Sequence, residues 1–254
     1  MRLNSKVALV TGGASGIGEG IVRRFVAEGA RVWLADVSEE QGRSVAEQTG
    51  ATFVRLDVSQ EADWADAMRD IAKAHGRLDI LVNNAGIISN EAIDAVTIEA
   101  WNRAIAINLT GPMLGCRAAI DIMRHQSDPI GGSIINVGST TSFLGLANDA
   151  VYTATKTAIL GLTRSAAAQC AKMGWSIRVN SLHPGTTDTE ILRRHIATDP
   201  SMLDRFNAMS PLGRMARVEE EAAMAVFLAS EEASYCTGSA YMADGGLTAT
   251  HPGM

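Results

Sequence analysis

The chain has 254 residues, of which 46% are hydrophobic and 20% are charged, and its formal net charge is −6 at pH 7. This length suits one large α/β domain or two small ones, and the hydrophobic content is typical of a globular protein with a full core. The acidic balance argues against a nucleic-acid partner, which requires a basic surface. The sequence has neither the run of about eighteen apolar residues that a membrane helix needs nor a signal-peptide pattern, so we expect a cytoplasmic protein without a membrane partner.

Short β-rich runs alternate with longer helical segments along almost the whole chain. The predicted strands are 6–11, 31–36, 52–57, 78–83, 132–139, 176–182 and 239–244. The predicted helices between them are 17–28, 39–48, 60–75, 99–125, 151–172 and 219–229. This alternation predicts an α/β fold with a seven-stranded parallel sheet, doubly wound, with helices on both faces.

The stretch 184–217 interrupts this alternation. It holds Pro184, Pro200 and Pro211 and two short helical segments around 189–196 and 200–208. A long excursion in a compact domain is usually a lid or a binding loop. We therefore expect a substrate-binding lid at about 185–217.

A glycine-rich loop follows the first strand directly. The segment TGGASGIG, residues 11–18, lies between strand 6–11 and helix 17–28. Glycine at 12, 16 and 18 lets the chain turn tightly, approach a pyrophosphate and pack helix against strand. Backbone N–H groups and the helix dipole then hold the phosphates, so this context predicts a dinucleotide-binding site.

Asp36 ends the second strand, eighteen residues after Gly18. A carboxylate there can accept hydrogen bonds from the adenosine ribose hydroxyls and repels a 2′-phosphate. No basic residue occupies 37 or 38, and Ser15 stands within the glycine loop. The sequence therefore predicts NAD rather than NADP, although Asp36 could also serve as a carboxylate at a helix N-terminus.

Tyr152 and Lys156 stand four residues apart in a predicted helix, so the phenol and the ammonium share a face. A nearby cation is expected to favour the phenolate and make the tyrosine a useful acid and base. Ser139, thirteen residues before the tyrosine, would give the substrate oxygen a neutral hydrogen-bonding partner. The alternative is an exposed helix face with a lysine stem lying along it.

Together these features resemble the short-chain dehydrogenase/reductase family in its compact, NAD-preferring form. The family's elements occur in its order, namely TGGASGIG, Asn83-Asn84-Ala85-Gly86, Asn108, Ser139, Tyr152, Lys156 and Pro184-Gly185. The resemblance reaches from the glycine loop to ADGG at 243–246, and it implies a single NAD-binding Rossmann domain over residues 1–254. Within the family, the sequence resembles bacterial hydroxysteroid and secondary-alcohol dehydrogenases most closely. The segments that carry this resemblance are GGSIINVGSTTSF, SIRVNSLHPG and FLASEEASYCTGSAYMADGG.

The resemblance also implies roles for individual residues. Tyr152 would be the general base in alcohol oxidation and the general acid in ketone reduction. Lys156 would lower the phenol pKa and hold the nicotinamide ribose, Ser139 would fix the substrate oxygen, and Asn108 would support a water-linked proton path. The implied cofactor-binding residues are Gly12, Ser15, Gly16, Ile17, Gly18, Asp36, Asp57, Val58, Asn84, Ala85, Gly86, Tyr152, Lys156, Pro184, Gly185, Thr187 and Thr189.

Gly138 and His183 stand next to residues of this set in the sequence. Gly138 stands where the family often has a second serine, and we expect it to widen the pocket slightly without affecting the mechanism. His183 precedes Pro184, and we expect a residue at a strand end without acid–base duty. No metal site is predicted, because Cys116, Cys170 and Cys236 are far apart, odd in number and set among apolar or small residues.

The predicted pocket is bounded by residues near 89–94, 140–149 and 185–209, which are rich in apolar side chains. This favours a hydrophobic secondary alcohol or ketone, such as a hydroxysteroid or a cyclic or aryl/alkyl carbinol. The candidate substrate-binding residues are Ser139, Thr141, Leu146, Tyr152, Gly185, Leu192 and Phe206. Some of these apolar groups could instead pack the lid or a subunit interface.

Two other functions remain open from the sequence. A 3-oxoacyl-thioester reductase would prefer NADPH and a basic surface, and Asp36 counts against both. A non-catalytic NAD-binding regulatory protein would tend to lose the tyrosine or the lysine, and both are present. By resemblance, helices 99–125 and 151–172 would build a homotetramer, although the small residues along the second helix could equally pack on the sheet.

Overall fold

The structure is a computed structural model that describes residues 1–126 and 131–250. One sheet of seven strands has the order β3-β2-β1-β4-β5-β6-β7, and every neighbouring pair is parallel. The strands are β1 Val7–Thr11, β2 Arg31–Asp36, β3 Thr52–Arg55, β4 Ile80–Asn83, β5 Gly132–Val137, β6 Ile177–Pro184 and β7 Ala240–Ala243. The predicted α/β fold is confirmed, and residues 127–130 and 251–254 of the predicted domain lie outside the described residues.

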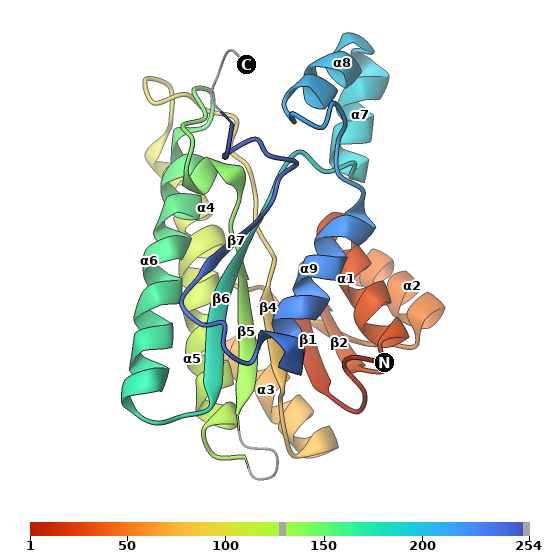
Figure 1. Cartoon of the computed structure of the whole chain (residues 1–254), viewed down its shortest axis with the longest axis vertical. Helices are drawn as coiled ribbons and strands as arrows, with labels where there is room; N and C mark the ends of the chain where they lie inside the picture. The colour runs from red at the N-terminus through yellow and green to blue at the C-terminus, as the bar shows by residue number, and fades with distance from the viewer. Residues whose placement is uncertain (127–130, 251–254) are drawn as a thin grey trace.

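Helices cover both faces of the sheet (Figure 1). One face carries α1 (Gly16–Ala27), α2 (Glu39–Thr49) and α9 (Val218–Ala229), and the other carries α3 (Glu61–His75), α5 (Gly111–Met123) and α6 (Ala150–Lys172). Side chains of β1 alternate between the two apolar cores, with Leu9 in one and Val10 in the other. A strand that is buried on both faces has apolar residues at consecutive positions. This continuous apolar run is why β1 could be predicted from the sequence.

The helix predicted over 99–125 is divided into three parts. It consists of α4 (Ile98–Ile105), a π-helical segment (Ala106–Thr110) and α5. A π segment inserts an extra residue into a helix and often marks a functional site. Here it contains the buried side chain of Asn108.

Some predicted strand ends were wrong. β3 stops at Arg55, and β5 stops at Val137, so Gly138 and Ser139 lie in the loop after it. β6 instead continues to Pro184, because it pairs with β7 up to that residue.

The predicted short helices after β6 are present as α7 (Glu190–Thr198) and α8 (Ser201–Ala208). They stand beyond the C-terminal end of β6, at the top of Figure 1. A parallel bridge between Thr187 and Ala216 joins the two ends of this excursion. Within residues 1–126 and 131–250, no helix combines the length and apolarity needed to cross a membrane.

Candidate active site

The glycine loop leaves almost no room for side chains. Gly12 and Gly16 have φ angles of +65° and +55°, a region that side chains disfavour. A Cβ on Gly12 would lie 2.9 Å from Ala85 Cα, and one on Gly18 would lie 2.0 Å from the Gly12 carbonyl oxygen. The loop therefore brings bare backbone and the N-terminus of α1 to one place, as a pyrophosphate requires.

Asn84 joins this loop to the end of β4. Its Nδ2 donates to the carbonyls of Thr11 (3.0 Å) and Gly12 (3.1 Å). Thr11 Oγ1 in turn accepts from the backbone N–H groups of Asn84 (3.0 Å) and Ala85 (3.1 Å). These bonds connect β1 and β4, where the strand order reverses and where ligands bind in open α/β sheets.

Asp36 lies against the glycine loop. Its Oδ2 accepts from Ala14 N at 3.1 Å, and its Oδ1 accepts from Ser38 N at 2.9 Å. Val37 beside it is 58% exposed. The carboxylate thus occupies the position expected for a ribose contact, and its bond to Ser38 just before α2 also satisfies the alternative interpretation.

Asp57 and Val58 follow β3, the neighbour of β2, at the same edge of the sheet. Asp57 Oδ1 accepts from both the backbone N–H and the hydroxyl of Ser59. Val58 is buried, and its carbonyl accepts from Trp64 Nε1 at 2.9 Å. The structure therefore brings both residues to the same edge as Asp36, as a shared adenosine site would need.

The predicted catalytic side chains lie together. Lys156 Nζ is 5.6 Å from the centroid of the Tyr152 ring, and the Tyr152 phenol has a hydrogen bond with Ser139. Lys156 is 4% exposed, and its Nζ donates to the Val137 carbonyl at 2.8 Å. The alternative of an exposed helix face is therefore wrong for this lysine.

The electrostatics of this group are set mainly by burial. Burial raises the pKa of Tyr152, the hydrogen bond with Ser139 lowers it, and the Asp149 carboxylate raises it further. Burial also lowers the pKa of Lys156 to about 8. The pKa of Tyr152 is raised overall, because removing the phenolate from water costs more than the interaction with Ser139 returns, and the lowering of this pKa by Lys156 stays a prediction.

Asn108 fixes the backbone that leads to this group. Its Nδ2 donates to the Ile87 carbonyl (2.8 Å) and to Thr155 Oγ1 (3.3 Å), and its Oδ1 accepts from Ile87 N (2.8 Å). A Cβ on Gly86 would lie 3.3 Å from Asn108 Oδ1 and 3.4 Å from Lys156 Nζ. The glycine keeps open a cradle in front of both polar atoms, and this cradle fits a cofactor ribose.

His183 occupies the space beside Gly138. The imidazole is fully buried, and its Nδ1 lies 3.0 Å from the Ser139 carbonyl oxygen and 3.1 Å from Ser142 Oγ. A Cβ on Gly138 would lie only 2.3 Å from that nitrogen. The expectation that Gly138 widens the pocket is wrong, because the imidazole fills the space under Ser139.

The segments predicted to line the substrate pocket carry apolar side chains of differing exposure. Phe206 is 8% exposed and packs within the lid, whereas Leu146 is 38% exposed and Leu192 is half-buried. Gly185 lies against Asp244, where a Cβ would be 2.7 Å from the Asp244 Cα. The exposed large apolar residues of the predicted pocket segments are Ile93, Phe143, Leu144, Leu146, Ile191, Leu203 and Met209.

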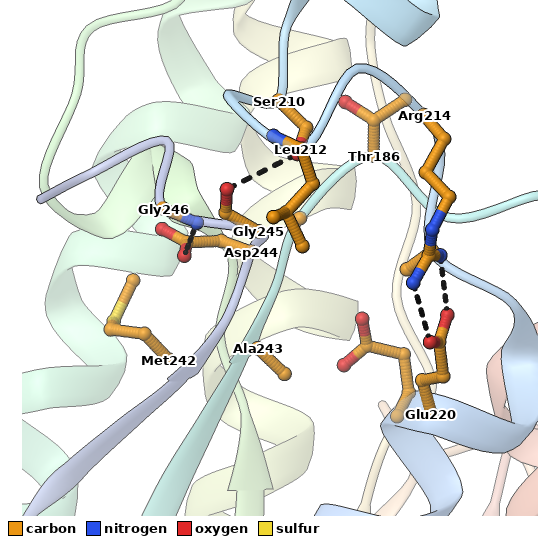
Figure 2. Close-up of a pocket in the computed structure, with 13 residues that line it drawn as sticks. Thr186, Ser210, Leu212, Arg214, Glu220, Met242, Ala243, Asp244, Gly245 and Gly246 are labelled. Atoms are coloured by element: carbon orange, nitrogen blue, oxygen red, sulfur yellow. Dashed lines mark hydrogen bonds and ion pairs between the residues drawn. The ribbon is translucent and has the colours of Figure 1, made fainter. Parts of the chain in front are cut away.

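A separate cavity of about 320 Å³ lies at the base of the lid (Figure 2). Its walls are Gly185–Thr186, loop residues between 210 and 216, the start of α9 and the end of β7. Arg214 pairs with Glu220 at 2.7 Å on one side, and Ser210 Oγ bonds the Gly245 carbonyl on the other. None of the four predicted catalytic side chains lines this cavity, so the proton chemistry lies elsewhere.

Sequence reasoning missed the partners of these residues. Asp149 caps α6, and its place just before the helix is a signal that the N-cap rule could have detected. Thr155 and Ser142 carry no such signal, because their contacts depend on which elements pack together.

A glycine loop at the reversal point of a parallel sheet, with a half-buried tyrosine and a buried lysine beside it, defines a dinucleotide-dependent oxidoreductase site. Comparison with known proteins agrees, because a family model described as enoyl-(acyl carrier protein) reductase matches residues 12–248. The chain belongs to the short-chain dehydrogenase/reductase family, as its sequence predicts. Members of this family use nicotinamide dinucleotide cofactors.

Three of the proteins similar to this chain are named as dehydrogenases of different substrates. The 3-alpha-(or 20-beta)-hydroxysteroid dehydrogenase of Mycobacterium bovis is 42% identical, over 98% of this chain and 91% of the relative. The 3-beta-hydroxysteroid dehydrogenase of Comamonas testosteroni is 39% identical, over 97% of both chains. The NADP-dependent (R)-specific alcohol dehydrogenase of Lentilactobacillus kefiri is 36% identical, over 98% of both. One relative is named NADP-dependent, so the relatives do not decide between NAD and NADP for this chain. The residues that contact the adenosine ribose would decide this preference.

Proposed function

We propose that this protein is an NAD(H)-dependent dehydrogenase that interconverts a hydrophobic secondary alcohol and its ketone, with Tyr152 as general acid and base. The observation that carries the proposal is the group of Ser139, Tyr152 and buried Lys156, set beside the open cradle at Gly86. When bound, the nicotinamide cofactor supplies the hydride acceptor for oxidation and the hydride donor for reduction.

The protein's own part is orientation and proton transfer. Ser139 and Tyr152 share a hydrogen bond, so both hydroxyls can converge on one substrate oxygen. Because the phenol pKa is raised, Tyr152 is protonated at neutral pH and ready to donate to the oxygen of a ketone. Alcohol oxidation needs the same phenol as a base, so its rate should rise with pH.

Lys156 and Asn108 support this transfer. Lys156 would hold the nicotinamide ribose, since its Nζ and Asn108 Oδ1 both border the Gly86 cradle. The two atoms could also share a water and pass a proton outward, which is the role we assign to Asn108.

The choice of NAD follows from Asp36. Its carboxylate stands at the glycine loop without a basic neighbour at 37 or 38, so a 2′-phosphate would meet negative charge. We assign the cofactor to the predicted set, which runs from the glycine loop through Asp57 and Asn84 to Gly185 and Thr189. Most of these residues lie at the carboxyl ends of parallel strands or in the loops that follow them, and the others lie in the first turns of α1 and α6.

The substrate class follows from the apolar approach and from the relatives. Phe143 and Leu144 are 46% and 43% exposed after β5, and Ile191 is 57% exposed on α7. Exposed apolar side chains from several elements suit a large apolar substrate. Because two relatives are named for hydroxysteroids and a third is named an (R)-specific alcohol dehydrogenase, we favour a hydroxysteroid or a cyclic or aryl/alkyl carbinol.

Two further features complete the proposal. The excursion 185–217 is the lid that covers the substrate, and the enzyme acts in the cytoplasm. The outer face of α5 and α6 would join copies of the chain into a homotetramer.

Initial rates with NAD⁺ and NADP⁺ on androsterone, cyclohexanol and 1-phenylethanol test the function. We expect oxidation with NAD⁺ at least tenfold faster than with NADP⁺, and Tyr152→Phe should lower the rate by roughly 10²- to 10⁴-fold. Faster reduction of acetoacetyl-CoA with NADPH would favour the thioester reductase instead. Tight NADH binding with no turnover of any alcohol or ketone would favour a regulatory protein.

A further inference from the structure

Asp149 is a buried carboxylate that connects two elements of the site. It is 1% exposed, and its Oδ1 accepts from Tyr152 N (3.0 Å) and Ser89 Oγ (2.6 Å). Its Oδ2 accepts from the backbone N–H groups of Ser89 (2.7 Å) and Asn90 (2.8 Å). One carboxylate thus caps α6 and holds the loop that follows β4, sixty residues away in sequence.

The loop held in this way has an unusual shape. Asn90 has a φ angle of +56°, which is uncommon for a residue with a side chain. A second bond, from Ala150 N to the Glu91 carbonyl (3.1 Å), ties the same loop to the same helix end. The loop carries Ile88, 45% exposed, and borders the segment 89–94 that we expect to line the substrate pocket.

We propose that Asp149 is a positioning residue for the alcohol chemistry: its carboxylate clamps loop 88–91 onto the first turn of α6 and places a fixed negative charge at Tyr152. The inference rests on the proposed function, because it requires Tyr152 to be the acid and base. It assigns to one side chain both the placement of the substrate wall and part of the tuning of the phenol.

The charge of Asp149 acts on the phenol in a defined direction. After burial and the bond with Ser139, the Asp149 carboxylate is the remaining influence, and it raises the pKa of Tyr152. The other titratable groups nearby are Lys156, with Nζ 5.6 Å from the ring centroid, and His183 behind Ser139. Burial lowers the pKa of His183, so this imidazole is neutral, and the Asp149 carboxylate at the N-cap of α6 is the nearby group whose charge raises the pKa of the phenol.

The test compares Asp149→Asn with Ser89→Ala, which removes one contact and keeps the charge. Glu99→Gln, which changes an exposed acid on α4 outside the predicted pocket segments, is the matched control. We would measure NAD⁺-dependent oxidation of androsterone, or of 1-phenylethanol if it turns over faster, from pH 6 to 10, together with NADH affinity by fluorescence. Asp149→Ser keeps an N-cap oxygen without the charge and serves as the second variant if the asparagine variant folds poorly.

For Asp149→Asn we expect KM to rise roughly tenfold or more, since several hydrogen bonds to a charged group are lost. In the plot of oxidation rate against pH, the rise on the acidic side (the acidic limb) should move to lower pH. The affinity for NADH should stay within about twofold of the wild-type value. Ser89→Ala should raise KM without moving the limb, and Glu99→Gln should change neither quantity.

A limb that stays in place, or moves to higher pH, in both charge-removing variants would overturn the inference. So would a shift in Ser89→Ala as large as that in Asp149→Asn. Tyr152→Phe is measured in the same series to separate the two proposals. If that variant is inactive and the Asp149 profile is unmoved, the positioning role alone is wrong; if it remains active, the proposed function and this inference are both wrong.

Discussion

Gly138 and His183 are fitted to each other under Ser139. The imidazole is fully buried, contacts the backbone of Ser139, and packs edge-on against Phe143 with ring centroids 5.0 Å apart. Its Nε2 lies 2.8 Å from Ser181 Oγ, so both ring nitrogens have partners. The histidine therefore supports the Ser139 backbone, in keeping with the prediction that it has no acid–base duty.

Gly138→Ala tests this support. The added Cβ would lie 2.3 Å from His183 Nδ1, so the imidazole or the Ser139 backbone must move. We expect a loss of about 1–3 kcal/mol in the free energy of unfolding, the usual cost of overpacking, together with a reduced kcat. Urea denaturation and steady-state kinetics measure both. Gly145→Ala, where a Cβ would meet nothing within 4 Å, is the control for overpacking and should leave the free energy of unfolding unchanged.

Asp36 gives a prediction on cofactor choice. Replacing it with alanine and Val37 with arginine removes the repulsion of a 2′-phosphate and adds a cation where the side chain is 58% exposed. The ratio of kcat/KM for NAD⁺ to that for NADP⁺ should fall by roughly 10²-fold or more. An unchanged ratio would mean that Asp36 serves only the loop and the start of α2.

At the level of elements, α9 carries a buried acid that the proposed chemistry does not use. Glu221 is 0% exposed; its Oε1 accepts from Thr187 Oγ1 at 3.3 Å, and its Oε2 is buried without a partner among the described residues. Burial raises the pKa of this carboxyl to about 8. The acid is therefore neutral at pH 7 and links α9 to the segment expected to hold the cofactor.

This raised pKa makes stability depend on pH. The carboxyl ionises near 4.5 in the unfolded chain and near 8 in the folded one, so between these values only the folded state keeps the proton. The free energy of unfolding therefore falls as pH rises through this window, by at most about 1.4 kcal/mol per unit. Glu221→Gln mimics the neutral acid and should unfold at a higher temperature than wild type at pH 8, with little difference at pH 4.5. Scanning calorimetry measures the unfolding temperatures of this variant and of the exposed control Glu219→Gln at both pH values. Equal changes in unfolding temperature for the two variants would contradict the role given to Glu221.

The elements were predictable where one local pattern decides them. Continuous apolar runs located the strands, and the glycine spacing located the start of α1. The π segment at Ala106–Thr110 was missed, and its residue Asn108 bonds to Ile87, which lies 21 residues away in the sequence. Distance in sequence explains why Glu221 and the loop contacts of Asp149 were missed, since each involves a distant segment of the chain.

For the whole molecule, the outer surface of α5 and α6 bears on assembly. A groove of about 530 Å³ runs between these helices, lined by side chains that include Met113, Leu162 and Trp175. Ala154, Gly161 and Ala168 recur every seven residues along the exposed side of α6. Small residues with this spacing let a second helix approach closely, so this face suits the proposed subunit contact better than the alternative of packing on the sheet.

Gly161 gives the sharpest test of this contact, because a Cβ there would meet nothing within 4 Å in the isolated chain. Gly161→Arg should leave the fold intact and break a helix-to-helix contact between subunits. Light scattering after size-exclusion chromatography should show four times the 26.8 kDa chain mass for wild type and a smaller assembly for the variant. Gln41→Arg, on the exposed side of α2, should remain tetrameric, and so should Gly161→Ala, which also removes a helix-disfavouring glycine. A Gly161→Arg tetramer would place the subunit contact on another face, and a wild-type monomer would show that one chain forms the complete enzyme.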